Sequence, residues 1–478
     1  MIISSSRLAL AAALLATPAS PALAQQKAPE RRSDAIAAAT NDLRSQDLPY
    51  DAHALELGKA AMSDGTAWDI LEDLTTEVGP RLGGTPAEAR ARDWSVTRLK
   101  ALGFKNVRVE EYQMPTWVRG AESAEILTPY PQQVVLTALG NSGATPVEGL
   151  TAEVVGYEDY AAFIADSLAN QRGKIVFISN DMPRNQDGSG YSMPFGAPRW
   201  VGPNEASKRG AAAIVVRSIG TDHNRTPHTG GTNFEDGVTP IPAAALAVPD
   251  AEQLMRMLDR AQSPVRMKLV LTPRNIGMQT SGNVIAEVPG RDPSAKKVLV
   301  GCHLDSWDNA PGVFDDGAGC AIVAAAAKRI MDAGTPERTI QVVWYGAEEV
   351  GIWGGRDFGE RHDGADYHVV AESDFGADRV WSVSTDLGDD RRAEADRLRA
   401  TLAPLGIASG AYDQAGGADV GPLRAEGAPG ISLRQDGTRY FDLHHTSNDT
   451  LDKVDPEQLQ QNVAAWTAML AVIAGPIQ

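Results

Sequence analysis

The stretch VLVGCHLDSWDNAPGVFDDGAGCAIVAAAAKRIM, residues 298–331, contains the pattern that decides the fold. It opens with apolar, β-branched residues typical of a buried strand, and from Gly319 onward its alanine-rich end predicts a helix. Runs of the same strand type occupy residues 283–288, 339–345 and 367–371. Because strands alternate with a helix, the sequence predicts an α/β fold, a mixed and mostly parallel sheet with helices on both faces.

Polar residues follow these predicted strands at the points where the strands end. His303 and Asp305 come at the end of the strand that begins at residue 298. Glu348 and Glu349 follow the strand at 339–345, and Asp374 follows the strand at 367–371. In α/β sheets the working residues gather just past the carboxyl ends of the strands. Each group alone is more typical of a structural histidine or a solvated loop. Their recurrence at successive strand ends indicates one shared site.

Two further groups complete a set of metal ligands. Asp315 lies in the turn after the first strand, and His444, His445 and Asp449 lie near the carboxyl terminus. A donor set of His, Asp and Glu without cysteine is what catalytic zinc prefers. Such ligands suit two divalent ions bridged by one carboxylate, an arrangement that holds a water and polarises a carbonyl. Asp305 is positioned to orient the ring of His303.

The amino-terminal residues predict an export signal. Arg7 precedes the apolar run at residues 8–16, and Ala22-Leu23-Ala24 fits the small-x-small pattern before a cleavage site. We therefore expect a signal peptide at residues 1–24, followed by a polar leader at 25–47. A membrane anchor is the weaker alternative, because the run is shorter than the roughly 20 apolar residues that span a bilayer.

The remaining chain divides into three parts that differ in their predicted helix and strand patterns. Residues 48–116 and 276–478 carry the helix and strand patterns of the main domain. Residues 117–275 contain short β-type runs, at 134–136, 174–178 and 213–216, between turns rich in Gly, Pro and Asn. This middle part is expected to be a separate domain inserted into the first.

The net charge excludes one class of partner, and the cysteine content bears on the core. The formal net charge of −18 argues against a nucleic-acid partner, which needs a basic surface. The chain has 2 cysteines, Cys302 and Cys320, and each lies in an apolar stretch. We interpret both as small buried hydrophobic residues, with a bridge between them left open.

The site motifs resemble those of a known enzyme family. His303-Leu304-Asp305, Asp315-Asp316-Gly317, Glu348-Glu349, Asp374 and His445-Thr446 are similar to the signature of peptidase family M28, the co-catalytic zinc aminopeptidases. Within it, the likeness is strongest to the branch that contains carboxypeptidase Q. It extends to Gly79-Pro80-Arg81-Leu82-Gly83-Gly84 and to nearly everything after the leader, with the middle part resembling an inserted protease-associated (PA) domain.

The resemblance implies a role for each site residue. One zinc would be held by His303 and Asp374 and the other by Glu349 and His445, with Asp315 bridging. Glu348 would be the general base that deprotonates the bridging water and passes its proton to the leaving amine. His444 would be a neighbouring or substrate-facing residue. Asp305 would be the partner of His303, and Asp449 would orient the loop that carries the last ligand. The family likeness also suggests a homodimer.

The expected function is therefore that of an exported, two-zinc exopeptidase acting on short peptides or dipeptides, without a membrane span after removal of the signal. Two alternatives resemble the same fold: a non-enzymatic binding protein of the transferrin-receptor kind, and a single-zinc acyl-transfer enzyme of the glutaminyl cyclase kind. The motifs leave open whether the enzyme acts from the amino or the carboxyl terminus.

Overall fold

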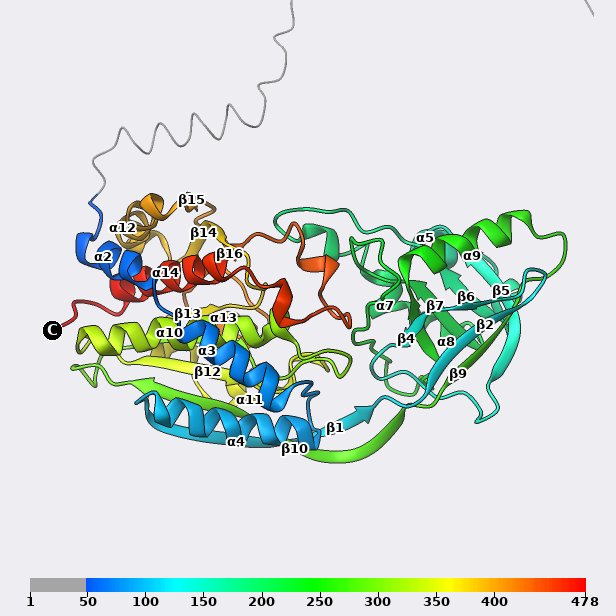
Figure 1. The fold of residues 1–478 in the computed structure, drawn as a ribbon, viewed down its shortest axis with the longest axis horizontal. Helices are drawn as coiled ribbons and strands as arrows, with labels where there is room; N and C mark the ends of the chain where they lie inside the picture. Colours follow the sequence, from blue (N-terminus) through cyan, green and yellow to red (C-terminus); the bar gives the residue numbers. More distant parts are fainter. Residues whose placement is uncertain (1–48) are drawn as a thin grey trace, which may run out of the picture. The chain divides into compact units, whose positions relative to one another are not determined.

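The structure is a computed structural model and describes residues 49–478. The predicted signal peptide and leader, residues 1–24 and 25–47, lie outside the described residues. Two eight-stranded sheets organise the described part of the chain (Figure 1). In residues 49–478, none of the helices has both the length and the apolar character needed to span a membrane.

The first sheet is mixed, with a parallel centre. Its strands, in spatial order, are β1 (Lys105–Val118), β10 (Arg274–Val288), β12 (Ile340–Tyr345), β11 (Lys297–His303), β13 (Tyr367–Glu372), β16 (Gly430–Gln435), β14 (Val380–Asp386) and β15 (Ala408–Ser409). Strands β12, β11, β13 and β16 pair in parallel, whereas β10 is antiparallel to β1 and β12, and β14 is antiparallel to β16. The predicted mixed α/β fold is confirmed.

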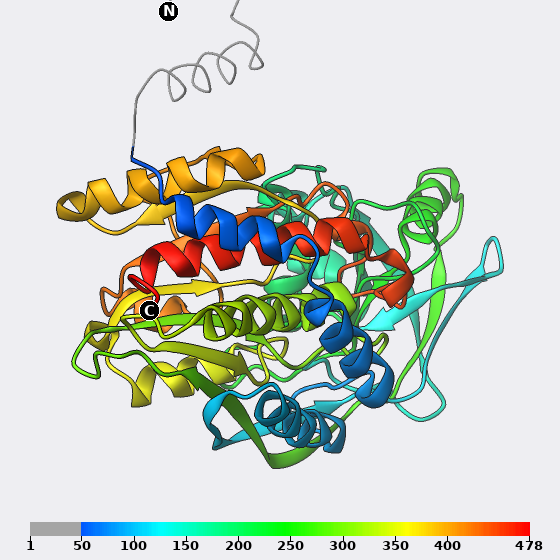
Figure 2. The ribbon, with the colours of Figure 1, turned by 60° about the vertical axis from the view of Figure 1, so that its left-hand side comes forward.

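Helices cover both faces of this sheet. They are α2 (Ala52–Ala61), α3 (Thr66–Asp73), α4 (Pro86–Ala101), α10 (Ala318–Ala333), α11 (Trp353–Arg361), α12 (Arg392–Leu402), α13 (Gly421–Ala425) and α14 (Pro456–Ile473). Because side chains alternate along a strand, Val298 and Val300 pack with α10 and α14 on one face, and Leu299 packs with α11 and α13 on the other. Figure 2 shows α2, α14 and α10 lying side by side on the first of these faces.

A second sheet is built by residues between β1 and β10, here called the second-sheet segment (119–273). Its strands, in spatial order, are β3 (Gln132–Val134), β2 (Glu122–Thr128), β9 (Arg266–Leu271), β5 (Leu150–Tyr157), β6 (Ile175–Ile178), β7 (Ala213–Arg217), β8 (Ala243–Leu246) and β4 (Leu136–Ala138). Its helices are α5 (Tyr160–Ala165), α6 (Leu168–Gln171), α7 (Ala197–Trp200), α8 (Gly202–Lys208) and α9 (Val248–Arg260). In Figure 1, β1 and β10 run together between the two sheets.

The strand predicted at 134–136 is in fact two short strands. β3 ends at Val134 and pairs with β2, whereas β4 begins at Leu136 and pairs with β8. Between them Val135 leaves both ladders. Its N–H donates to Asp250 Oδ2 at 2.6 Å, and its carbonyl accepts from Ala247 N–H at 2.9 Å. The apolar run therefore continues in sequence while the chain changes its strand partner.

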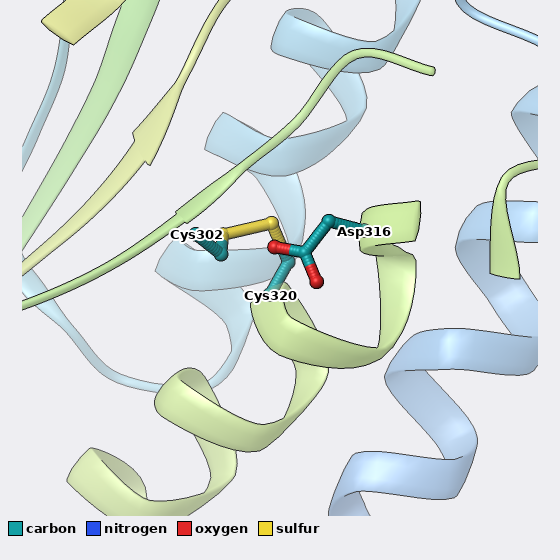
Figure 3. Close-up of side chains that lie close together, drawn as sticks. All are labelled: Cys302, Asp316 and Cys320. Carbon is teal, nitrogen blue, oxygen red and sulfur yellow. A yellow bond between two sulfur atoms is a disulfide. The ribbon is translucent and has the colours of Figure 1, made fainter. Parts of the chain in front are cut away.

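The two cysteines are buried, as expected, but they form a disulfide bond (Figure 3). Of the two states that the sequence left open, the bridged one is therefore observed. Cys302 is next to His303 at the end of β11, and Cys320 lies in the first turn of α10. Although Asp316 lies beside both sulfurs, the bond leaves no thiolate to bind a metal. The disulfide ties the end of the strand to the helix that follows.

Replacing both Cys302 and Cys320 with Ala is expected to lower the free energy of unfolding by about 3 kcal/mol, because the bond closes a loop between residues 18 positions apart. Urea unfolding of the wild type and the double variant, followed by circular dichroism, measures the difference. Equal midpoints and slopes for the two proteins would show that the bond contributes nothing to stability.

Candidate active site

The candidate site lies at the carboxyl edge of the first sheet, where neighbouring parallel strands end. β11 ends at His303, which is opposite Tyr345, the last residue of β12. Glu348 and Glu349 follow β12, and Asp374 follows β13, which is also parallel to β11. Parallel strands end at the same edge of a sheet, so residues far apart in the sequence meet here.

Asp315 is placed by the turn between β11 and α10. Its Oδ1 lies 3.0 Å from His303 Nε2. The turn is held by Asp449, whose carboxylate accepts hydrogen bonds from the main-chain N–H groups of Val313, Phe314 and Asp315 at 3.0, 2.6 and 3.1 Å. Asp449 therefore positions the main chain around Asp315. It does so although Asp449 itself lies in the loop that carries His444 and His445, here called the histidine loop.

The adjacent histidines both point toward Asp315. His445 has a φ of 62°, a left-handed conformation that is uncommon outside glycine and that persists mainly at functional sites. Its Nε2 lies 2.8 Å from Glu349 Oε2 and 3.2 Å from Asp315 Oδ2. His444 stacks on His445 with ring centroids 3.5 Å apart, and its Nε2 is 3.5 Å from the same Asp315 oxygen. The shorter distances favour His445 as the ligand.

The structure thus brings the five predicted ligands into one cluster: His303, Asp315, Glu349, Asp374 and His445. Asp374 Oδ1 is 3.4 Å from His303 Nε2. Burial, together with the nearby carboxylate of Asp315, raises the pKa of Asp374 and raises the pKa of Glu349 to about 7. Buried carboxylates packed this closely resist ionisation together unless positive charge is supplied.

The donor atoms fit a divalent metal. Two buried oxygens of the cluster, Asp315 Oδ2 and Glu349 Oε1, accept no hydrogen bond from residues 49–478. A buried carboxylate oxygen without a donor is costly, and a bound cation offsets that cost. Ligand atoms of His303, Asp315 and Glu349 lie within 4.8 Å of one another. Imidazole and carboxylate donors without thiolate suit catalytic zinc.

Glu348 lines the pocket beside this cluster. Burial raises the pKa of its carboxyl well above the ordinary value, and the carboxylates of Asp374 and Glu349 add to the effect. Its main-chain N–H donates to Asp305 Oδ1 at 2.9 Å. Asp305 Oδ1 lies 3.6 Å from His303 Nδ1, whereas the main-chain carbonyl of Asp305 lies closer, at 3.1 Å. Asp305 therefore links the strand end of His303 to the loop that carries Glu348.

The pocket around these residues has a volume of about 390 Å³. Its wall comes from both sheets, because the second-sheet segment contributes Asn141, Tyr191, Arg199, Trp200, Gly231 and Asn233. The same segment also contacts the histidine loop. His228 Nδ1 is 2.8 Å from the His444 carbonyl, and the N–H of Thr229 donates to the His445 carbonyl at 2.9 Å. The second-sheet segment is therefore part of the site.

Comparison with known proteins identifies the family. The family model described as Peptidase family M28 matches residues 283–470, a range that contains all five clustered residues. Carboxypeptidase Q of Bos taurus is 34% identical over 415 residues, which cover 85% of each chain, and carboxypeptidase Q of Homo sapiens is 33% identical over 88% of each. The chain belongs to peptidase family M28. It is a metallopeptidase of that family, as the motifs predict.

Solved structures agree with this assignment. The peptidase M28 precursor from Shewanella amazonensis has 44% sequence identity and a TM-score of 0.85, and the match covers 89% of this chain and 98% of that one. An aminopeptidase from Aneurinibacillus sp. strain AM-1 shares the fold at 20% identity, with a TM-score of 0.62 over 88% of this chain and 96% of that chain. Both matches extend over the second-sheet segment as well as the first sheet, because each covers far more than either alone.

Two positioning residues of this M28 site were not assigned from the sequence. Arg81 is fully buried, and its guanidinium donates to the main-chain carbonyls of Leu304, Pro311 and Gly312, so it holds the loop between His303 and Asp315. The motif around Arg81 was noted only for its resemblance. Asp316 accepts hydrogen bonds from the N–H groups of His303 at 3.1 Å and Gly319 at 3.0 Å.

Replacing Asp449 with Ala is expected to weaken metal binding about 10–100-fold, because residues that orient a ligand affect metal affinity to that extent. The substitution removes all three acceptor contacts to the turn of Asp315. Competition with a chromophoric chelator measures the affinity. Asp452→Asn is the matched control, since Asp452 lies on the same loop and pairs with Lys453 at the surface. Unchanged affinity in Asp449→Ala would contradict the assigned role.

Proposed function

We propose that this M28 peptidase is an exported exopeptidase that uses two zinc ions to hydrolyse short peptides, dipeptides among them. One observation carries the proposal: two histidines, three carboxylates and Glu348 meet at one strand edge, and all of them except His303 line one pocket. Five of these side chains form the donor set of a two-metal hydrolase, and the carboxylate of Glu348 is available for proton transfer.

The ligands divide into two groups around Asp315. His303 and Asp374 form one group and His445 and Glu349 the other, because each histidine lies within 3.4 Å of its partner carboxylate. The two oxygens of Asp315 face opposite ways, with Oδ1 at 3.0 Å from His303 and Oδ2 at 3.2 Å from His445. This placement supports Asp315 as the bridging ligand. His444 is assigned to the wall of the pocket.

When bound, a zinc pair polarises the scissile carbonyl and lowers the pKa of water. Glu348 accepts a proton from the attacking water and donates it to the nitrogen of the departing amine, so that the leaving group departs neutral. Asp305 holds the main chain of Glu348 in place through its N–H. Burial raises the pKa of Glu348, and a carboxyl with a raised pKa holds the proton more readily between the two transfers.

The second-sheet segment is proposed to be a PA-type domain that limits access to the pocket. Its residues form one wall of a cavity of about 390 Å³, a size suited to a small ligand. We therefore expect short peptides to be accepted and long chains to be excluded. Equal rates for a dipeptide and a ten-residue peptide with the same amino-terminal residues would contradict this role.

Export is proposed from the predicted signal peptide at residues 1–24 and is supported by the disulfide. Structural disulfides persist in oxidising compartments such as the periplasm or the extracellular medium. The bond between Cys302 and Cys320 is therefore consistent with a protein that folds outside the cytoplasm. A homodimer is proposed from the family likeness.

The test is turnover of a panel of unblocked dipeptides by the mature, zinc-loaded protein, with release of amino acids measured by chromatography. Hydrolysis of free dipeptides, and its loss on chelation, is the expected result. Cyclisation of amino-terminal glutamine without hydrolysis would favour the single-zinc acyl-transfer reaction. Absence of any reaction in the metal-loaded protein would favour a binding protein.

A further inference from the structure

A histidine outside the metal cluster holds the main chain of the histidine loop. His228 lies in the second-sheet segment, between β7 and β8, and is 1% exposed. Its Nδ1 lies 2.8 Å from the His444 carbonyl, which can only accept a hydrogen bond, so Nδ1 carries a proton and donates it. On the other side of the ring, Nε2 lies 2.7 Å from Asp222 Oδ1. The ring therefore links a carboxylate of the second-sheet segment to the main chain beside the predicted ligand His445.

The His228 ring occupies a close-fitting position. The main-chain N–H of His228 donates to Ser218 Oγ at 2.9 Å, and a Cβ added at Gly220 would lie 2.3 Å from the ring nitrogen Nε2. The second oxygen of Asp222 accepts from the N–H of Asn224 at 2.7 Å, so the carboxylate beside the ring is itself held in place. These contacts leave the ring a single orientation, in which its Nδ1–H is directed at the histidine loop.

The residue after His228 contacts the ligand itself. The Thr229 N–H donates to the His445 carbonyl at 2.9 Å, and the Thr229 carbonyl lies 3.3 Å from His445 Nδ1. The opposite ring nitrogen, Nε2, faces the cluster of predicted ligands. An imidazole that binds a metal through Nε2 carries its proton on Nδ1, and an acceptor at Nδ1 fixes the orientation of the ring. Arg199 Nη1, 3.5 Å from the same nitrogen, can only donate, so the Thr229 carbonyl is the acceptor.

The other histidine of the cluster has different support. His303 Nδ1 lies 3.1 Å from the carbonyl of Asp305, two residues along its own chain. The remaining side-chain partners of His303 in residues 49–478 are Asp315 and Asp374, which also belong to the first sheet and its connections. The two proposed metal positions therefore differ, because only the one at His445 takes the acceptor for its histidine from the second-sheet segment.

We propose that His228 is a positioning residue for His445, and that through it the second-sheet segment controls binding of one of the two zinc ions, the ion assigned to Glu349 and His445. The proposal rests on the proposed two-zinc function. It gives the second-sheet segment a role in metal binding besides its proposed role in access to the pocket. The zinc assigned to His303 and Asp374 binds without this support.

Two amide side chains separate the two ring contacts of His228. In His228→Gln the amide nitrogen takes the place of Nε2 and keeps the contact with Asp222, but the His444 carbonyl loses its donor. In His228→Asn the amide nitrogen takes the place of Nδ1 and donates to the His444 carbonyl, but Asp222 Oδ1 loses its partner. A buried carboxylate oxygen without a donor is costly, so His228→Asn is expected to have the lower melting temperature of the two variants.

Zinc affinity is expected to rank the two variants in the opposite order. Titration of the metal-free protein with zinc, in competition with a chromophoric chelator, resolves two affinities in the wild type. In His228→Gln one affinity is expected to weaken about 10–100-fold, the effect of removing a residue that orients a ligand, and the other to change less than about threefold. His228→Asn is expected to keep both within about threefold. His223→Gln is the matched control, because His223 lies on the same loop with its side chain 72% exposed.

A double variant identifies the ion that is affected. His445→Ala removes the ligand and is expected to leave one zinc affinity. Adding His228→Gln to His445→Ala is expected to change this remaining affinity less than about threefold, because both substitutions act on the same ion. A further loss of about 10-fold in the double variant would overturn the proposal, since it would indicate a general structural effect. Equal zinc losses in His228→Gln and His228→Asn would overturn it as well.

Hydrogen exchange of the metal-free protein separates failure of this proposal from failure of the two-zinc function. The main-chain amides at 443–446 are expected to exchange faster in His228→Gln than in the wild type or in His228→Asn, because opening of the histidine loop becomes less costly. Two zinc affinities that His228→Gln leaves unchanged would contradict the proposal and leave the two-zinc function intact. A wild type without zinc affinity would contradict the two-zinc function, and unchanged exchange in His228→Gln would contradict the hold of His228 on the loop.

Discussion

Replacing Glu348 with Gln is expected to lower kcat about 10²–10⁴-fold while leaving zinc content unchanged, because general base catalysis contributes that much. Glu348 faces the pocket, and its carboxylate is not needed to complete the ligand groups around His303, Asp315 and Glu349. Glutamine has the same shape but cannot accept the proton of water. Steady-state kinetics on a free dipeptide and elemental analysis of the purified variant measure the two quantities.

A glutamate outside the pocket provides the matched control for Glu348→Gln. Glu360 is exposed on α11, in the helix that follows the Glu348 loop, so Glu360→Gln is expected to retain full activity. Glu348→Asp keeps the base but withdraws it by one methylene, and an intermediate rate is expected. If Glu348→Gln retained wild-type kcat, another residue would have to be the base. If it lost zinc, the residue would have to be reassigned as a ligand.

Replacing Asp315 with Asn is expected to have the other large effect. Asp315 lies between the two histidines of the cluster, and it is the only described carboxylate within 3.2 Å of both His303 and His445. Asparagine removes one negative charge and replaces one carboxylate oxygen of the proposed bridging ligand with an amide NH₂ group. We expect zinc content to fall below two per chain and activity to fall at least about 10³-fold, as metal catalysis supplies several kcal/mol.

The matched control for this substitution is Asp308→Asn. Asp308 lies in the loop between His303 and Asp315, but it pairs with Arg119 instead of pointing into the cluster. Its replacement is expected to leave zinc content unchanged. Full zinc and full activity in Asp315→Asn would show that Asp315 does not bridge the metals.

The sheet that carries the site was predictable because its strands are buried on both faces. Apolar runs such as 298–301 and 342–345 have no polar alternation, and this favours central parallel strands over surface ones. The helix predicted from Gly319 to Met331 is observed at Ala318–Ala333. Residues placed directly after such strands meet at one edge by topology alone, so the convergence of His303, Glu349 and Asp374 could be anticipated.

Contacts across the two sheets could not be anticipated in the same way. Arg199 and His445 are 246 positions apart, and no periodicity links a short helix such as α7 to the histidine loop. The disulfide is a similar case, because two cysteines in apolar stretches are compatible with free thiols or with a bond. The break of the strand at Val135 depends on Asp250, a partner more than a hundred residues away. These features depend on tertiary placement, which local sequence patterns do not encode.

The central claim is that two metal ions and Glu348 together form the catalytic site, and metal counting alongside turnover tests it most directly. The mature protein is purified, its metals are quantified by elemental analysis, and hydrolysis of a free dipeptide is followed before chelation, after chelation and after zinc is returned. We predict about two zinc ions per chain, loss of activity on chelation and recovery with zinc. Full activity in the metal-free protein, or with a single ion per chain, would contradict the account.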